Sequence, residues 1–142
     1  MKVLYSNRIV STGTNYLHRM RAGNFDLATD EPPALGGRGE APAPYDYYLA
    51  SLAACTAITL RMYAERKGWN LGEFSAELSY MRDEDGGAHI HRVLHSDQPL
   101  DDAQWQRLLE IAEKTPVTKT MRASTRITSE RAAPGRSADK DA

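Results

Sequence analysis

The residue with the clearest capacity for chemistry in this sequence is its single cysteine, Cys55. It lies within Leu49–Leu60, an uncharged run of small apolar and hydroxyl residues. A thiol well inside a helix that is apolar on every side is expected to be buried. Apolar burial raises the pKa of a thiol and keeps it inert, whereas a nearby cation lowers the pKa and gives a nucleophilic thiolate. Whether Cys55 reacts or only packs in the core therefore depends on which residues the fold places beside it.

Three histidines form a second group with chemical potential. His89, His91 and His95 alternate along one predicted strand, so their side chains share a face of it. Alternating histidines can ligate zinc, but no cysteine lies near them and the acidic residues 83–85 fall in a turn. We therefore predict an exposed strand face without zinc, and no metal or other cofactor for this chain.

Length and composition restrict the class of protein. A chain of 142 residues predicts one domain, large enough for a core and small enough to depend on a partner chain. The net charge of −1 predicts neither a nucleic-acid partner nor an acidic membrane surface. One cysteine excludes an intrachain disulfide, and the N-terminus lacks the apolar segment of a secretion signal. Leu49–Leu60 is shorter than the roughly 18–20 residues that span a bilayer. A cytoplasmic location is expected.

The first half of the sequence predicts strands, a loop and a long helix. Alternating apolar and β-branched residues over 2–10 and 16–29, with turn signals between them, predict a three-stranded meander. The segment 30–44 is a predicted loop, because its prolines and glycines suit neither a helix nor a central strand. The helix is expected to begin at Pro44 or Tyr45 and to end at Lys67, before a capping glycine.

The second half predicts a hairpin, a second helix and a final strand. These elements are expected at 74–80 and 89–95 for the hairpin, Asp101–Lys114 for the helix, 123–129 for the strand, and 131–142 for a disordered tail. The order segregates helices from antiparallel sheets, so the fold class is α+β, with one domain over residues 1–130. An apolar helix of this length needs cover on all sides, which sheets from two subunits supply most easily. We therefore predict a homodimer.

Three segments carry a more specific resemblance: Pro44–Leu71 around Cys55, Asp30–Gly37 upstream, and Leu108–Val117 downstream. They resemble the osmotically inducible protein C (OsmC) and organic hydroperoxide resistance (Ohr) family, over almost the whole chain from the second strand onward. The resemblance implies an intertwined α+β homodimer with antiparallel sheets on a long buried central helix and a thiol site between the subunits. It also implies a bacterial redox protein of the oxidative stress response.

In this family a first cysteine attacks an organic hydroperoxide and a second cysteine resolves the product. Cys55 matches the first cysteine, but Thr115 stands where the second is expected. Thr118 replaces a family histidine, and Tyr45, followed by Asp46, replaces a glutamate found in many members. A sulfenic acid on Cys55 then has no internal thiol with which to form a disulfide. An external thiol or dithiol reductant is therefore implied.

An activating cation for Cys55 is harder to assign from the sequence. Arg19, Arg21 and Arg38 are assigned to the site together with Asp46, and no motif selects one arginine. The helix dipole cannot replace them, because Cys55 lies several turns beyond the helix start. Residues assigned to a substrate pocket are Tyr45, Tyr48, Thr59, Thr115 and Thr118. The tyrosines are alternatively packing residues at a dimer seam, and the last two threonines helix-end hydroxyls.

Three functions remain open at this point. The first is a divergent thiol-dependent hydroperoxide reductase that acts through one cysteine at the dimer interface. The second is a non-catalytic protein that binds a small apolar ligand in a pocket between the subunits. The third is a metal-binding or scaffold protein that uses the histidine strand. An arginine close to Cys55 would favour the first over the second.

Overall fold

The computed structural model describes residues 1–133 and 135 of the chain, and these residues form two compact units. The first unit comprises residues 1–47 and the residues from 127 onward, and the second comprises residues 48–126. Among the described residues, no helix is both long and apolar enough to cross a membrane. The predicted tail, 131–142, falls largely on residues outside this description. One domain over residues 1–130 stays a prediction.

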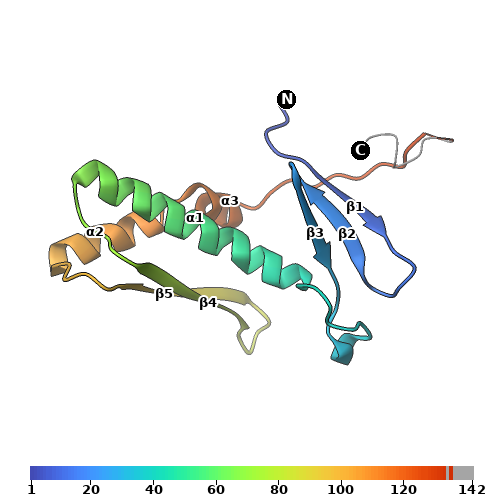
Figure 1. The fold of residues 1–142 in the computed structure, drawn as a ribbon, viewed down its shortest axis with the longest axis horizontal. Coiled ribbons are helices and arrows are strands. Elements are labelled where there is room, and N and C mark those ends of the chain that lie inside the picture. Colours follow the sequence, from blue (N-terminus) through green and yellow to red (C-terminus); the bar gives the residue numbers. More distant parts are fainter. Residues whose placement is uncertain (134, 136–142) are drawn as a thin grey trace. The chain divides into compact units, whose positions relative to one another are not determined.

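The first unit contains an antiparallel sheet of three strands (Figure 1). The strands pair in the order β1-β2-β3 and are β1 (Asn7–Ser11), β2 (His18–Ala22) and β3 (Phe25–Thr29). The register places Met20 between Ile9 and Leu27, so these three apolar side chains share a face of the sheet. Gly23, with a φ of 58°, occupies the tight turn between β2 and β3. The predicted meander is confirmed.

The loop after β3 is organised around the buried carboxylate of Asp30. Its oxygens accept hydrogen bonds from the backbone N–H groups of Glu31 at 2.8 Å, Arg38 at 3.3 Å and Glu40 at 3.1 Å. Burial disfavours the ionised carboxylate, but these donors outweigh burial and hold the pKa of Asp30 below its ordinary value. At Gly37 a Cβ would lie 1.9 Å from the carbonyl oxygen of Glu31, so only glycine fits there.

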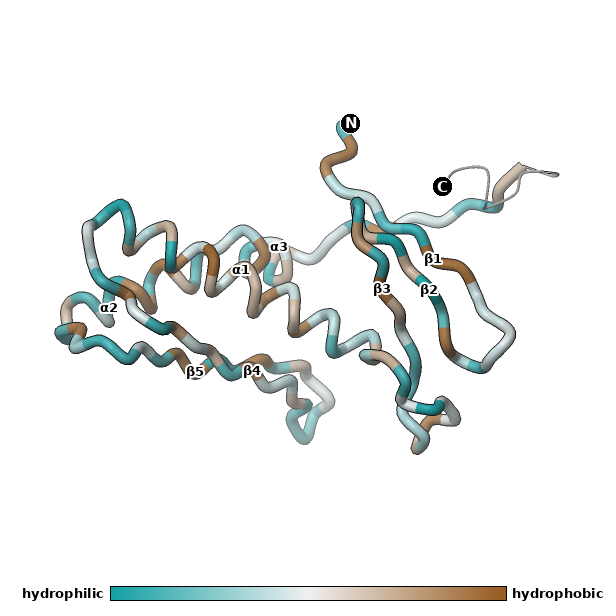
Figure 2. Tube along the Cα trace, viewed as in Figure 1, coloured by the Kyte–Doolittle hydropathy of each residue, from teal (hydrophilic) through white to brown (hydrophobic). Residues whose placement is uncertain are grey.

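Helix α1 (Pro44–Lys67) has the predicted bounds. The short 3-10 helix η1 (Pro33–Leu35) lies in the loop before it. A carboxylate oxygen of Asp46 accepts a hydrogen bond from the N–H of Ala43 at 2.9 Å, which stabilises the first turn. Gly68, with a φ of 70°, ends the helix in the left-handed conformation. The tube in Figure 2 is pale to brown through the middle of α1 and teal at its basic C-terminal end, so the apolar part of the helix is its centre.

The second unit combines most of α1 with a hairpin and two shorter helices. Its other elements are β4 (Phe74–Arg82), β5 (Ala88–Ser96), α2 (Asp102–Ala112) and α3 (Pro116–Ala123). The three helices lie on one side of the β4–β5 hairpin (Figure 1). Asp101 caps α2 through a reciprocal pair of hydrogen bonds with Gln104. The hairpin and the second helix are confirmed.

The C-terminal part of the second unit differs from the prediction. The segment after Thr115 is a helix, α3, and not merely the end of α2. The strand predicted at 123–129 is wrong, because residues 124–130 belong to no strand and pair with none in the described part of the chain. The β-branched residues of this segment favour a strand locally, but a strand requires a hydrogen-bonded neighbour to form.

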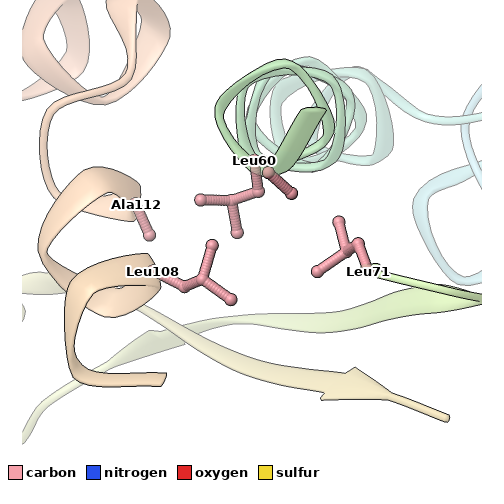
Figure 3. Packing of buried hydrophobic residues seen from close by; sticks show 5 residues of the cluster. Leu60, Leu71, Leu108 and Ala112 are labelled. Atoms are coloured by element: carbon pink, nitrogen blue, oxygen red, sulfur yellow. The ribbon is translucent and has the colours of Figure 1, made fainter. Parts of the chain in front are cut away.

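Five buried side chains form the core of the second unit (Figure 3). They are Leu60, Ala64, Leu71, Leu108 and Ala112. Leu60 of α1 and Leu108 of α2 point toward each other, and Leu71 closes the space beside the hairpin. Full burial of each leucine contributes about 1.5–3 kcal/mol. The core therefore fixes α1 against α2 and the hairpin, which are the elements that hold the site described below.

Within the described residues, only one side of α1 is covered. On the opposite side, the side chains of Ile58 and Met62 are 55% and 52% exposed. Enclosure of α1 on every side was expected from sheets of two subunits, and it stays a prediction. The buried residues recur every four positions and are Leu52, Thr56, Leu60 and Ala64.

The exposed apolar side of α1 is the physical basis for our prediction of a homodimer. Removal of Ile58 and Met62 from water would favour association of two chains. We expect analytical ultracentrifugation at micromolar concentration to show a dimer, and Ile58→Glu to shift it toward monomer or to unfold it. The matched control is Glu84→Gln, an exposed change in the turn between β4 and β5. A stable, native-like wild-type monomer would contradict the prediction.

Candidate functional site

The single cysteine lies on α1 and is half-buried. Its Sγ is 3.8 Å from Oγ1 of Thr59, one helical turn later, and this hydroxyl is the only hydrogen-bond partner of the sulfur within residues 1–133 and 135. Cys55 is therefore not fully buried within a single chain, and its full burial in a dimer stays a prediction. Cys55 precedes the buried Thr56, so it lies at the edge of the covered side of α1.

The side chain that organises this region is Arg92, on β5. One guanidinium nitrogen, Nη1, donates to Oγ1 of Thr56 at 2.9 Å and to Oγ1 of Thr118 at 3.1 Å. The other, Nη2, donates to the carbonyl oxygen of Ala112 at 2.9 Å. Arg92 thus joins the hairpin to α1, to the end of α2 and to α3, through three charge-assisted hydrogen bonds.

The charge of Arg92 interacts with several neighbours. Burial lowers the pKa of Arg92 below its ordinary value, the attraction of Glu113 opposes this, and the repulsion of Arg122 adds to it. Cys55 also raises the pKa of Arg92, because an ionised sulfur attracts the guanidinium. The structure therefore brings a cation to the cysteine from a residue that sequence analysis did not select.

The two threonines after α2 belong to the same network. Oγ1 of Thr115 caps α3 by accepting the backbone N–H of Thr118 at 3.2 Å, and the two hydroxyl oxygens lie 2.6 Å apart. Oγ1 of Thr118 donates to the carbonyl oxygen of Ala112 at 3.2 Å. Both threonines are buried. Thr115, which replaces the second family cysteine, is thus connected to α1 through Thr118 and Arg92.

The arginines assigned from the sequence belong to the first unit. Arg21 pairs with Asp26 at 3.0 Å, and Arg38 approaches Glu40 at 4.0 Å. Both pairs are exposed, as is Arg19 on β2. Their assignment to Cys55 stays a prediction.

Two further assigned residues, Tyr45 and Asp46, lie at the start of α1. Both belong to the first unit and are exposed. Asp46 stabilises the first turn through Ala43, as described above. Their catalytic and pocket roles also stay predictions.

A pocket of about 400 Å³ opens beside Arg92, between α1, the hairpin and α3. It includes Tyr48 and Thr118, both assigned from the sequence to a substrate pocket. Tyr48 and Tyr80 meet edge to face, with ring centroids 6.4 Å apart. The complete lining is Tyr48, Leu52, Tyr80, Ala88, His89, Ile90, Arg92, Thr118, Met121 and Arg122.

The histidines of β5 lie on its exposed face, as their spacing predicted. Within the described part of the chain, no three His, Cys, Asp or Glu side chains are grouped so as to hold a metal ion. We expect calorimetric titration with zinc to give no one-to-one isotherm, because these imidazoles are not grouped closely enough, with each other or with other ligands, to supply three ligands to one ion. A stoichiometric isotherm that the double change His89→Ala, His91→Ala abolishes would contradict this expectation.

Sequence analysis missed Arg92 although a signal for it was present. The alternation that places the three histidines on one face of β5 places Ile90, Arg92 and Leu94 on the other. A charged residue on the apolar face of a strand is rarely buried without a partner, so its position itself indicates a polar network. The sequence does not reveal which hydroxyls supply that network.

Comparison with known proteins places this fold in a family. A family model of OsmC-like proteins matches residues 37–130. No curated protein matches the sequence. Among solved structures, an organic hydroperoxide resistance protein OsmC from Legionella pneumophila is 24% identical, with a TM-score of 0.62 over 85% of this chain and 92% of that one.

Two other solved structures have the same fold. The organic hydroperoxide resistance protein OhrB of Bacillus subtilis is 25% identical, with a TM-score of 0.56 over 82% of this chain and 90% of that one. A candidate osmotic stress induced and detoxification response protein from Psychrobacter arcticus is 22% identical, with a TM-score of 0.71 over 84% of this chain and 89% of that one. Because the family model covers about two thirds of the sequence and these structures share its fold, this chain belongs to the family of OsmC-like proteins.

Proposed function

We propose that this protein is a thiol-dependent organic hydroperoxide reductase that acts through Cys55 alone. The observation that carries the proposal is the attraction between Cys55 and the guanidinium of Arg92. A thiolate is the nucleophilic form of cysteine, and a nearby cation favours it. The solved relatives named as organic hydroperoxide resistance proteins support the choice of substrate.

The reaction has two balanced halves. The Cys55 thiolate attacks the outer oxygen of the hydroperoxide, the O–O bond breaks, and the alkoxide leaves and takes up a proton to become the alcohol. The sulfur is thereby oxidised to sulfenic acid. Two external thiols, or one dithiol, then reduce the sulfenic acid to the thiol, with formation of one disulfide and release of water.

The reductant must be external because the side chain at position 115 is a hydroxyl and not a thiol. It lies at the cap of α3, where the family's second cysteine is expected, and it cannot form a disulfide with an oxidised Cys55. In a homodimer, Arg19, Arg21, Arg38 and Asp46 would complete the site from the partner subunit, and Tyr45, Tyr48, Thr59 and Thr118 would contact the substrate. This assembly would work in the cytoplasm, where small thiols are abundant.

The direct test is trapping of the sulfenic acid. Treatment of the wild type with cumene hydroperoxide in the presence of dimedone is expected to give one dimedone adduct, located on Cys55 by peptide mass spectrometry. With dithiothreitol in place of dimedone, the wild type is expected to consume the peroxide. Cys55→Ser is expected to do neither. Thr120→Ser, an exposed change on α3, is the matched control.

Peroxide consumption by Cys55→Ser at the wild-type rate would overturn the proposal, and so would a wild-type thiol that remains reduced. The second result would favour the other function, a non-catalytic protein that binds a small ligand. The pocket beside Arg92 is the specific observation that favours this second function.

A further inference from the structure

The pocket beside Arg92 carries an inference of its own, because its lining combines two kinds of surface. Leu52, Ile90 and Met121 form apolar walls, and the guanidinium groups of Arg92 and Arg122 lie in the same lining. Ligand pockets of this kind bind an apolar body and fix its orientation with a few polar groups. The composition therefore suits a ligand with one apolar part and one charged part.

The charges around the pocket indicate the sign and size of the ligand's charge. Burial is the main cause of the lowered pKa of Arg92, and the repulsion between Arg92 and Arg122 adds to it. Arg122 is ion-paired with Glu113, so Arg92, Arg122 and Glu113 together carry one net positive charge. A ligand with a single negative charge neutralises this excess, whereas an uncharged ligand leaves it and a dianion reverses it.

The hydrogen bonds of Arg92 also leave it able to bind a ligand. A guanidinium has five N–H donors, and three hydrogen bonds hold Arg92 to Thr56, Thr118 and Ala112. These contacts fix the side chain on the fold, so it loses little further freedom when it binds an anion. The planar guanidinium matches the two oxygens of a carboxylate.

We propose that this pocket binds a small amphipathic monocarboxylate, with its carboxylate on Arg92 and Arg122 and its apolar chain against Leu52, Ile90 and Met121. Binding does not require the sulfur of Cys55, which is outside the lining. The proposal therefore stands apart from the peroxide chemistry proposed above.

The test uses octanoate and its uncharged analogue octanamide, titrated into the full-length wild type by calorimetry. Octanoate is expected to bind at least about tenfold more tightly than octanamide, and its affinity alone is expected to fall as salt rises. Octyl phosphate, largely dianionic at pH 8, is the comparison ligand that tests whether the pocket prefers a phosphate to a carboxylate. Cys55→Ser is expected to bind octanoate as the wild type does, even if the peroxidase proposal fails.

Two variants locate the site. Arg122→Met removes one cation without disturbing the three hydrogen bonds of Arg92, and Met121→Glu places a negative charge among the walls. Each is expected to weaken octanoate binding at least about tenfold. Arg66→Met, an exposed change at the far end of α1, is the matched control and should leave binding unchanged. Circular dichroism melting of each variant checks that the fold persists.

Several results would overturn the proposal. These are equal affinity for octanoate and octanamide, tighter binding of octyl phosphate, absence of octanoate binding at millimolar concentration, and unchanged octanoate affinity in both folded pocket variants. Loss of octanoate binding in a folded Cys55→Ser would overturn the claim that the sulfur is not required.

Discussion

Thr115→Cys is expected to form a disulfide with Cys55 when the protein meets an organic hydroperoxide. Oxidation of Cys55 gives a sulfenic acid, and a thiol at position 115 would condense with it and release water. The geometry required is a Cα separation of about 5–6 Å. The hydrogen bonds that run from Thr115 through Thr118 and Arg92 to Thr56, the residue after Cys55, support this proximity.

Intact-mass spectrometry reads the outcome directly. After one equivalent of cumene hydroperoxide, Thr115→Cys is expected to lose two hydrogen atoms, whereas the wild type gains one or more oxygen atoms. With dithiothreitol the variant is expected to survive repeated additions of peroxide that inactivate the wild type by over-oxidation. Thr115 also caps α3, so a stability cost of about 1 kcal/mol is expected from the substitution.

Two control variants distinguish the effect of the new thiol from the effect of losing the cap of α3. Thr115→Ser keeps a capping hydroxyl and adds no thiol, so it is expected to behave as the wild type. Thr120→Cys adds a thiol on the exposed part of α3 and should not pair with Cys55 within a chain. If Thr115→Cys keeps both thiols after oxidation, position 115 does not face Cys55. Undiminished turnover by the wild type over many cycles would show that a second cysteine is unnecessary.

The elements that the sequence predicted well are those with strong local signals. Pro44 and Gly68 mark the two ends of α1, and Asp101 marks the start of α2, because the caps act within a few residues. The strands of both sheets follow from alternation and turn residues. Helix α3 was missed although Thr115 and Pro116 are themselves helix-start residues, because the same two residues also end α2.

The features that could not be predicted depend on contacts between distant segments. The half-burial of Cys55 depends on which side of α1 the hairpin and α2 cover, and Leu49–Leu60 is apolar on all sides. The sequence suggested arginines of the first unit without a motif to select one, whereas in the second unit Arg92 interacts electrostatically with Cys55. Strand alternation could place Arg92 on the inner face of β5, but it could not identify Thr56 and Thr118 as its partners.

Arg92→Met is expected to slow the reaction of Cys55 and to destabilise the second unit. Removal of the guanidinium removes its electrostatic interaction with Cys55, so alkylation of Cys55 by neutral iodoacetamide at pH 7 is expected to slow relative to the wild type. The change also removes three hydrogen bonds and leaves the carbonyl oxygen of Ala112 with one partner fewer. The free energy of unfolding is expected to fall by about 1–3 kcal/mol in urea titrations.

Arg92→Lys separates the charge of this residue from its hydrogen bonds. Lysine keeps a cation near Cys55 but cannot reproduce the planar fork that reaches α1, α2 and α3 together. In Arg92→Lys, alkylation of Cys55 is therefore expected to recover toward the wild-type rate, while the free energy of unfolding of the variant remains reduced. Arg107→Met, on the exposed face of α2, is the matched control for loss of an arginine and should leave the alkylation rate unchanged. If Arg92→Met lowers stability but leaves alkylation at the wild-type rate, Arg92 holds the helices together without activating the thiol, and the observation that carries the peroxidase proposal is lost.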